Sequence, residues 1–568
     1  MRVPVVAVWL GVMATGVGLA MWVSQGMREL DLELPPLDQS RSRPQGGFFV
    51  AATVEPLHLN PLTTSDAAVR TLILRYTHDS LLYPDPKTGA LMPAVAEAVE
   101  LEPGTGALTV RLRPGVVFSD GAALTIADLE FAYRAAKAPG ATFGSAREAF
   151  DPLDGFETID ARSCRLRVAT PMPHVRMLVS LAYPVVQARY WRSAVASLAA
   201  AEGKTAPAVG SAEFSALLAR VRLPGPGTGA YVVARDRVSG EAAWRRGIDL
   251  TLVQNPSSWR RLAQPDCWNL MGLRFRFLSD AAAILAELRA GRLDWYFGED
   301  AEALQSAHPA LQQRMRLADY RSPRLGHHMV VWNLRRKPFD DVRVRRALSM
   351  LFDRNAIVSD LLKGRGRAAA AWFRPDDQEY PTDLAPMPFD PTQARALLTA
   401  AGVVGESVVP FTVTVFVGDH SPLQRRILEL ALPAFATAGV QLVIERRYWG
   451  DVVERYEKRD FDAVLMSWNH QAVCDPFFNF HSSQSDAPGK NYSGLQDPEI
   501  DAQLVAARNE LDDQKRIGMY RAWAHSLSRL EPVSLLVHPR PTLLIDKRFQ
   551  DAEPGALGVV LDRFWVAP

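Results

Sequence analysis

Hydrophobic positions recur along the chain with two periods, which predict strands and helices in alternation. Short apolar or alternating runs between turn residues predict strands at 47–54, 108–113, 231–233, 248–253, 273–277, 293–297, 327–333, 411–416, 441–446 and 464–468. Apolar residues three and four places apart predict helices at 66–82, 126–137, 211–220, 280–290, 391–401 and 422–438. The order of strand 411–416, helix 422–438 and strand 441–446 predicts a βαβ unit. This alternation is typical of the α/β fold class.

Two of the predicted helices have clear start signals. Thr125 is suited to cap the helix that follows it, because its hydroxyl can accept a hydrogen bond from a free backbone N–H. Asp128 lies in the first turn of this helix, where the helix dipole favours a negative charge. Asp390 precedes a second helix in the same way, with Pro391 at the first helical position. These acidic residues therefore have structural explanations.

A glycine- and proline-rich stretch at 224–231 reads Pro-Gly-Pro-Gly-Thr-Gly-Ala-Tyr. Its residue types predict a tight, irregular turn. The apolar runs 231–233 and 248–253 are expected to pair as strands of one sheet. A phosphate-binding loop is not predicted, because no Gly-Lys-Ser/Thr follows and no helix opens after the turn.

Composition describes a globular protein of several domains. At about 100–200 residues per domain, 568 residues predict two or three. The net charge of +1, with both signs well mixed, favours no nucleic-acid partner. The three cysteines, Cys164, Cys267 and Cys474, have no Cys-x-x-Cys spacing, which excludes zinc ribbons and thioredoxin-like chemistry. One long-range disulfide stays open.

The N-terminal segment 1–23 is expected to direct export. It carries one charged side chain, Arg2, and then the uncharged run 3–23. As a helix rising about 1.5 Å per residue, this run just crosses a hydrocarbon core of about 30 Å. It therefore predicts a signal-anchor or a cleaved signal peptide, and in both cases the rest of the chain is exported. No cysteine follows the run, which excludes a lipoprotein anchor, and the polar residues 24–46 predict a linker.

Two loops collect polar and aromatic residues that suit a ligand pocket. The ligand-binding candidates in these loops are Glu55, His58, Trp468, Asn469, His470 and Asp475. Ordinary loop packing is the alternative interpretation of the same residues.

The sequence predicts no metal site, no cofactor and no enzyme. His470, Cys474, Asp475 and His481 share a loop but lack the paired spacing of metal ligands. The neighbours His327 and His328 point to opposite faces of a strand, which is unsuited to holding one ion. No nucleophile–base motif stands at a suitable place, so no catalytic residue is predicted.

Six segments, in order along the chain, resemble motifs of the family 5 extracellular solute-binding proteins, the oligopeptide-, dipeptide- and nickel-binding class. They are 57–61, 113–128, 227–231, Asn333 with 338–348 and 353–354, the loop that starts at Trp468, and 491–494 with 497–501. One departure is Ala230, where the family usually has proline. Each motif alone is moderately specific, and their common order identifies the chain as a member of the family.

The resemblance implies an α/β, periplasmic-binding-protein-like fold: two lobes joined by a hinge beside a cleft, with a third domain inserted in the first lobe. The expected division is 47–75, 223–325 and 536–568 for lobe I, 76–222 for the inserted domain and 326–535 for lobe II. The implied function is the extracytoplasmic component of an ABC importer, which encloses a peptide or peptide-like small solute and delivers it to permease subunits. The chain is expected to be a monomer, periplasmic or on the outer face of the cytoplasmic membrane. A membrane-anchored sensor or scaffold with the same fold is the alternative.

The resemblance also implies roles for particular residues. Peptide-binding members hold the ligand's amino terminus with an Asp four residues before the loop proline, and Ala472 has that place here. A buried ammonium would then lack an ion partner worth about 2–5 kcal/mol. Glu55 resembles an acidic position on the facing lobe, and Trp468 corresponds to a pocket aromatic. A broad-specificity peptide binder is therefore less expected, whereas the expectation of a binding protein is unchanged.

Overall fold

The computed structural model describes most of the chain outside the N-terminal segment. It describes residues 30–35, 43, 45–64, 66, 69–85, 91–102, 105–141, 147–169, 175–264, 266–278, 280–298, 301–320, 326–405, 411–418, 421–469, 475–486, 489–510, 512–552, 554 and 559–567. None of the helices in these ranges is long and apolar enough to cross a membrane. The predicted export segment 1–23 lies outside them.

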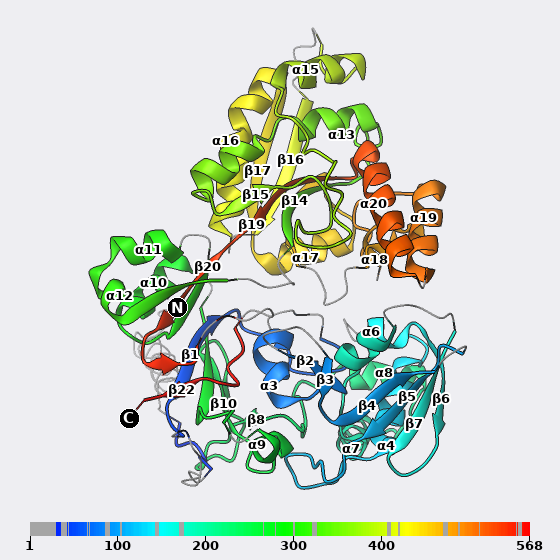
Figure 1. Cartoon of the computed structure of the whole chain (residues 1–568), viewed down its shortest axis with the longest axis vertical. Helices are drawn as coiled ribbons and strands as arrows, with labels where there is room; N and C mark the ends of the chain where they lie inside the picture. The colour runs from blue at the N-terminus through cyan, green and yellow to red at the C-terminus, as the bar shows by residue number, and fades with distance from the viewer. Residues whose placement is uncertain are drawn as a thin grey trace, which may run out of the picture.

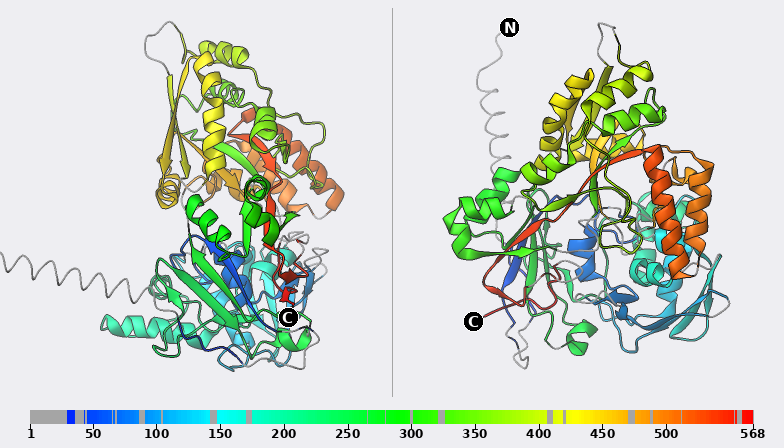
Figure 2. Two further views of the ribbon diagram at one scale, coloured as in Figure 1. Left: turned by 90° about the vertical axis from the view of Figure 1, so that its left-hand side faces the viewer. Right: turned by 45° about the horizontal axis from the view of Figure 1, so that its top comes forward.

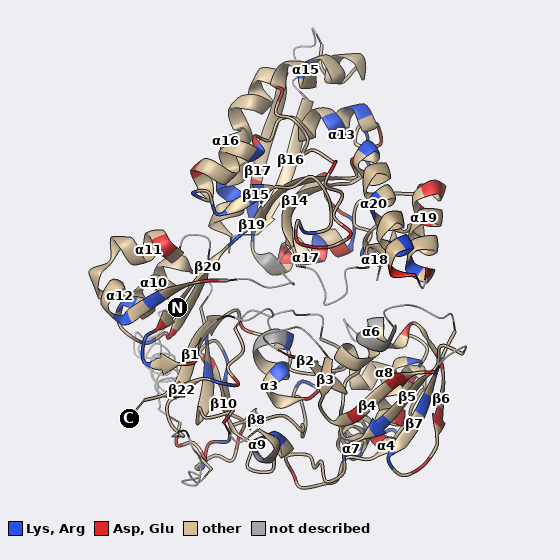
Figure 3. Cartoon of the chain, viewed as in Figure 1, with Lys and Arg blue, Asp and Glu red and all other residues tan. Residues whose placement is uncertain are grey.

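Two lobes follow one another along the longest axis of the molecule (Figures 1 and 2). The upper lobe is one continuous piece of chain, residues 326–540, and the lower lobe is built from the residues before and after it. Lys and Arg are interspersed with Asp and Glu over both lobes (Figure 3). The two lobes, each built of sheets and helices, confirm the expected α/β architecture.

The lower lobe is built on two sheets next to the connection with the upper lobe. Their orders are β1-β11-β10-β8, with β9 beside β10, and β12-β20-β13. The strands are β1 (Phe48–Thr53), β8 (Tyr231–Val233), β9 (Trp244–Arg245), β10 (Asp249–Gln254), β11 (Gly272–Phe277), β12 (Trp295–Gly298), β13 (Met315–Asp319) and β20 (Thr542–Asp546). Helices α10 (Ala281–Arg289), α11 (Ala301–Ala307) and α12 (Pro309–Arg314) accompany the second sheet. β8 pairs antiparallel with β10, as the sequence predicted.

An inserted domain forms the other side of the lower lobe (Figure 1). Its main sheet has the order β4-β5-β7-β6, and β2 and β3 form a separate pair. The elements are β2 (Leu82–Pro84), β3 (Leu91–Pro93), β4 (Ala96–Leu101), β5 (Leu108–Leu112), β6 (Leu153–Thr158), β7 (Ser163–Val168), α4 (Ile126–Ala136), α5 (Arg147–Phe150), α6 (Val175–Ala182), α7 (Ala188–Ala201) and α8 (Ala212–Leu218). Phe131, Trp191 and Phe214 are buried in its core. The predicted cap of α4 is confirmed, since Thr125 and Asp128 form a reciprocal capping box.

The segment entering the inserted domain touches the segment that returns from it. The Gly229 N–H donates to the Thr77 carbonyl over 3.1 Å. A Cβ on Gly227 would lie 1.9 Å from that carbonyl oxygen, and one on Gly229 would lie 2.4 Å from the Tyr76 oxygen. Gly227 and Gly229 are therefore required by the close approach of two backbones.

The upper lobe is a six-stranded sheet flanked by helices, in the order β15-β19-β14-β18-β16-β17. Its strands are β14 (His327–Trp332), β15 (Gly366–Ala368), β16 (Phe411–Gly418), β17 (Val440–Arg447), β18 (Ala463–Trp468) and β19 (Val533–Pro539). Its helices include α13 (Val342–Ser349), α14 (Arg354–Ala356), α15 (Pro391–Ala400), α16 (Pro422–Ala438), α17 (Trp449–Glu457), α18 (Phe477–Phe480), α19 (Pro498–Asn509) and α20 (Asp513–Leu530). β16 and β17 are parallel, which confirms the predicted βαβ unit. β19 stays in this sheet to Pro539, four residues beyond the expected end of lobe II at residue 535, and the division of the chain into domains stays a prediction.

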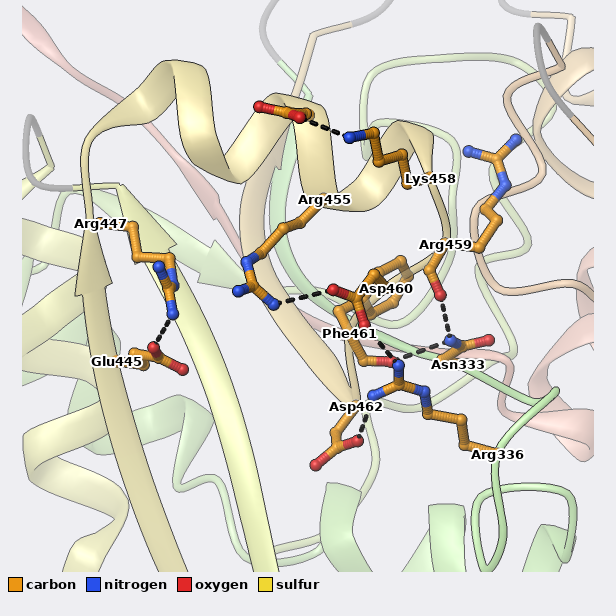
Figure 4. Close-up of polar contacts among 11 residues, drawn as sticks. Asn333, Arg336, Glu445, Arg447, Arg455, Lys458, Arg459, Asp460, Phe461 and Asp462 are labelled. Carbon is orange, nitrogen blue, oxygen red and sulfur yellow. Dashed lines mark hydrogen bonds and ion pairs between the residues drawn. The ribbon is translucent and has the colours of Figure 1, made fainter.

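Asn333 fastens the end of β14 to the turn that precedes β18 (Figure 4). Its side-chain amide donates to the carbonyls of Arg459, over 3.0 Å, and Phe461, over 2.8 Å. Arg336 pairs with Asp462 and Asp460 at the same turn. The asparagine of the 333–348 motif therefore has a structural role here.

Two sequence expectations about this lower lobe are corrected. The helix expected at 66–82 ends at Thr77, where η1 (Arg70–Leu74) and α3 (Arg75–Thr77) give way to the extended residue His78. Contacts made by the returning segment outweigh helix propensity at this point. Part of the expected linker 24–46 is packed on the lobe, because Leu32 bridges to Asp236 and the Arg237 N–H donates to the Asp31 carbonyl over 2.7 Å.

Candidate binding site between the two lobes

One strand end of the upper sheet nearest the hinge carries two of the predicted residues, Trp468 and, directly after it, Asn469. In the register of the sheet, Trp468 at the end of β18 stands opposite His327 at the start of β14.

A cleft of about 290 Å³ opens between the lobes, on the side where α18 and α19 stand over the inserted domain (Figure 1). Its walls come from both lobes, which gives the molecule a cavity at an interlobe position suited to a ligand.

Glu55 lies in the loop after β1 and is held by the turn between β9 and β10. Its Oε1 forms an ion pair with Arg246 Nε at 2.8 Å, and its Oε2 accepts the Gly247 N–H over 3.1 Å. Both carboxylate oxygens therefore have partners within the lower lobe. A direct contact between Glu55 and a ligand stays a prediction.

His58 is half-buried in the same loop and is favoured in its neutral form. Burial, together with the nearby positive charge of Arg222, lowers the pKa of its imidazole. The Nδ1 accepts the Asn60 N–H over 3.3 Å. Beside it, Leu57 keeps 78% of its surface exposed. This loop offers a neutral imidazole and an apolar side chain to its surroundings.

Asn60 holds this loop against the inserted domain. Its side-chain amide donates to the carbonyls of Leu218, over 3.0 Å, and Val221, over 3.1 Å, and its Oδ1 accepts the Leu62 N–H over 3.0 Å. The side chain is fully buried. Asn60 therefore positions the loop that carries Glu55 and His58.

Trp468 belongs to an aromatic cluster at the hinge end of the upper sheet. Its ring lies 5.7 Å from that of Trp372, which in turn lies 4.7 Å from His327 and 4.8 Å from Phe480. Asn469 follows Trp468 and is exposed. His470 lies outside the described residues, so its predicted role stays a prediction.

Asp475 is engaged by its own lobe on two sides. Its Oδ1 accepts the Phe477 N–H over 3.1 Å at the start of α18, and its Oδ2 forms an ion pair with Arg508 Nε at 2.9 Å. The Asp475 and Arg508 side chains are only 9% and 17% exposed. The Arg508 guanidinium lies over the rings of Phe477, at 4.4 Å, and Phe478, at 4.9 Å. Asp475 thus supports an aromatic wall, and its direct contact with a ligand stays a prediction.

Sequence reasoning missed three residues that the fold brings to this region: Trp372, Arg508 and His538. The His538 Nδ1 faces the Gly326 carbonyl at 3.2 Å, and burial lowers its pKa to about 4. Its ring lies 5.5 Å from His327, a residue more than two hundred places earlier. His538 reaches this region through the pairing of β19 with β14 and β15, and Arg508 lies on α19, so no local motif could have indicated these residues.

Metal ligation finds no support among the described residues, where no group of three or more His, Cys, Asp or Glu could hold an ion. Cys164 is buried, Cys267 is partly buried, and both are free thiols. Cys474 lies outside the described residues.

Comparisons with known proteins agree with this geometry. The family model of the bacterial extracellular solute-binding proteins, family 5, matches residues 90–491, well over half of the chain. The dipeptide-binding protein of Pseudomonas aeruginosa is 25% identical over 313 residues, which are 55% of this chain and 56% of that protein, so the match spans about half the length of each. The oligopeptide-binding protein AppA of Bacillus subtilis is 23% identical over 93% of both chains.

The fold itself is shared with a solved structure. AppA of Bacillus subtilis in complex with a nonapeptide has a TM-score of 0.78 at 20% identity, covering 93% of this chain and 100% of that one. These relatives are binding proteins and not enzymes. A non-enzymatic binding protein is what the sequence predicted.

Proposed function

Because the chain belongs to family 5 of the bacterial extracellular solute-binding proteins, we propose that it is the extracytoplasmic binding component of an ABC importer. In this proposal it encloses a peptide or peptide-like solute between the two lobes and delivers it to a permease. The observation that carries the proposal is the interlobe cleft, whose walls are contributed by both lobes. The relatives that bind dipeptides and oligopeptides support the choice of solute class.

The connection between the lobes suits a hinge. The chain crosses after β13 and again between β19 and β20, and the Tyr320 N–H donates to the Pro541 carbonyl over 3.2 Å. His538 holds the first crossing by its contact with the Gly326 carbonyl. Rotation about these neighbouring segments would move the lobes as rigid bodies and remove a bound solute from water.

We also propose where the chain is located in the cell and how it divides into domains. The chain acts as a monomer after export, with residues 1–23 as a signal peptide or an uncleaved anchor. Lobe I, the inserted domain and lobe II are the three domains, and lobe II extends to Pro539. Glu55, His58, Trp468, Asn469, His470 and Asp475 are the proposed ligand-binding region, and Glu55 and Asp475 also hold neighbouring residues of that region in place.

Native mass spectrometry of the exported chain, purified without denaturation, tests the function first. We expect an excess mass that disappears on unfolding and identifies the solute. Small-angle scattering should then show a smaller radius of gyration when that solute is added back at saturation. A chain that carries no solute, and neither binds nor compacts with a mixture of di- to pentapeptides, would contradict the proposal.

A deletion strain separates transport from sensing. If the protein feeds an importer, cells without it lose uptake of the identified solute, and the intact gene restores it. Unchanged uptake, together with solute binding in vitro, would favour the anchored sensor or scaffold instead.

A further inference from the structure

We propose that the cleft between the inserted domain and α18–α19 is a subsite for one uncharged aromatic or branched apolar group of the bound solute. This inference rests on the proposed function and deepens it. The cleft is lined from above by Phe477, Phe478, Gln484, Val505, Arg508 and Asn509, and from below by Asp151, Pro152 and Ala169. The sequence motifs do not indicate this cleft, because they indicate the hinge end of the upper sheet.

The upper wall is a prepared aromatic surface. Phe477 and Phe478 stand side by side, with ring centroids 5.7 Å apart at an angle of 84°. Arg508 lies against both rings, and the ion pair with Asp475 fixes its guanidinium there. Both rings are partly exposed, as is Val505 at 41%. Rigid rings held in this way lose little entropy when they contact a ligand.

The lower wall comes from the inserted domain and is mostly apolar. The Ala169 N–H donates to the Pro152 carbonyl over 2.9 Å, which holds the start of β6 beside the end of β7. Pro152 is buried and Ala169 is exposed toward its surroundings. Because the two walls belong to different lobes, a group seated here contacts both lobes and stabilises their present arrangement.

Loss of hydration disfavours an ionic group of either sign in the cleft. A charged group that leaves water to contact Phe477, Phe478 and Val505 loses the solvation that stabilises its charge. The ion pair with Asp475 already occupies the guanidinium of Arg508. An uncharged group avoids this cost and gains contact with the two rings.

Size indicates that one group, and not a whole solute, occupies the subsite. Its volume of about 290 Å³ lies just below the roughly 300–1,000 Å³ of pockets that enclose entire ligands. The subsite therefore takes one side chain of a solute whose remainder lies nearer the hinge.

The test uses the full exported chain, calorimetry and tripeptides in which Phe, Leu, Lys or Glu replaces one residue of trialanine in turn. We expect a Phe or Leu peptide to bind at least about tenfold more tightly than its Lys and Glu counterparts, the size of a buried apolar contact. Phe478→Ala should remove most of this selectivity. Phe389→Ala is the matched control, since Phe389 is 45% exposed on the same lobe and does not line the cleft. Equal selectivity in Phe478→Ala and wild type, or a preference for Lys or Glu, would overturn the subsite.

A second probe keeps the two proposals distinguishable. N-acetylphenylalanine amide has no free amino group and is compared with N-acetylalanine amide by saturation-transfer NMR. We expect a signal for the phenylalanine compound alone, and its loss in Phe478→Ala but not in Phe389→Ala, with both variants showing the wild-type melting temperature. If no tripeptide binds but this pattern is seen, the peptide function fails and the subsite stands. If tripeptides bind without the pattern, the subsite fails and the function stands.

Discussion

At the scale of single residues, the ion pair of Asp475 and Arg508 shows how a motif residue can act through a partner. Arg508→Met keeps a long side chain against the two phenylalanine rings but removes the positive charge. The Asp475 carboxylate, which is only 9% exposed, then has lost its cation. We expect the free energy of unfolding to fall by about 2–3 kcal/mol, somewhat less than for a fully buried pair. Urea unfolding followed by tryptophan fluorescence measures the change.

The matched control for this prediction is the double variant Asp475→Asn, Arg508→Met. Because it removes both charges, it should be more stable than Arg508→Met alone. If the single and double variants unfold at the same urea concentration, the ion pair does not stabilise the wall of the cleft.

Burial of His78, where the segments entering and leaving the inserted domain meet, makes the stability of the protein depend on pH in a defined direction. Its ring is buried between the Thr77 hydroxyl, at 2.9 Å, and the Pro224 carbonyl, at 3.1 Å, and burial lowers its pKa to about 4. The unfolded chain, with a pKa near 6.5, therefore takes up this proton first as the pH falls. Stability from neutral His78 is fully present above about pH 6.5 and is lost as the pH falls toward 4.

His78→Gln tests this sign, since it cannot be protonated. Between pH 7 and pH 4.5 the wild type should lose about 2–3 kcal/mol more than the variant, at about 1.4 kcal/mol per pH unit. His525→Gln, at a partly exposed histidine beside Asp383, is the comparison. Parallel stability curves for wild type and His78→Gln would refute the assignment.

At the scale of elements, the segment 224–231, which returns from the inserted domain, packs with its backbone directly against the backbone of Thr77. Gly227→Ala places a methyl group where the Thr77 carbonyl oxygen lies 1.9 Å away, so the two segments must separate. We expect a loss of more than about 2 kcal/mol in thermal or urea unfolding, as for other overpacked sites. Gly518→Ala in α20 has no neighbour within 4 Å and should raise stability by about 0.5–1 kcal/mol. Equal effects at both positions would show that the contact with Thr77 does not matter.

Local signals account for the elements that the sequence predicted well. The capping box at Thr125, the cap at Asp390 with Pro391, and the βαβ unit of β16, α16 and β17 depend on near neighbours or on one period of apolar residues. The helix expected at 66–82 failed because its end is fixed by Gly229, about 150 residues later. The same distinction applies to the candidate site: Trp468 was predicted from a motif, whereas Trp372 reaches it by ring packing and His538 by sheet pairing.

At the scale of the whole molecule, an ion cluster links the lobes beside the hinge. Arg365 of the upper lobe donates from Nε to Glu302 Oε2 over 2.7 Å and from Nη1 to Asp319 Oδ1 over 3.3 Å, and both acids belong to the lower lobe. The two carboxylates are well exposed, so the cluster is worth only about 0.5–1 kcal/mol and is weakened by salt. That energy is nevertheless enough to shift a two-state lobe equilibrium by about two- to fivefold.

Arg365→Met should therefore loosen the present lobe arrangement without unfolding either lobe. We expect small-angle scattering of the solute-free variant at low salt to resemble that of the wild type at high salt, with the variant itself insensitive to salt. Arg343→Met is the control, because Arg343 pairs with Asp341 inside the upper lobe and bridges no hinge. Since the cluster is outside the cleft, any change in solute affinity would come through the lobe equilibrium and would stay within the same two- to fivefold range. A larger change, or a salt response that Arg365→Met leaves intact, would mean that other contacts set the angle between the lobes.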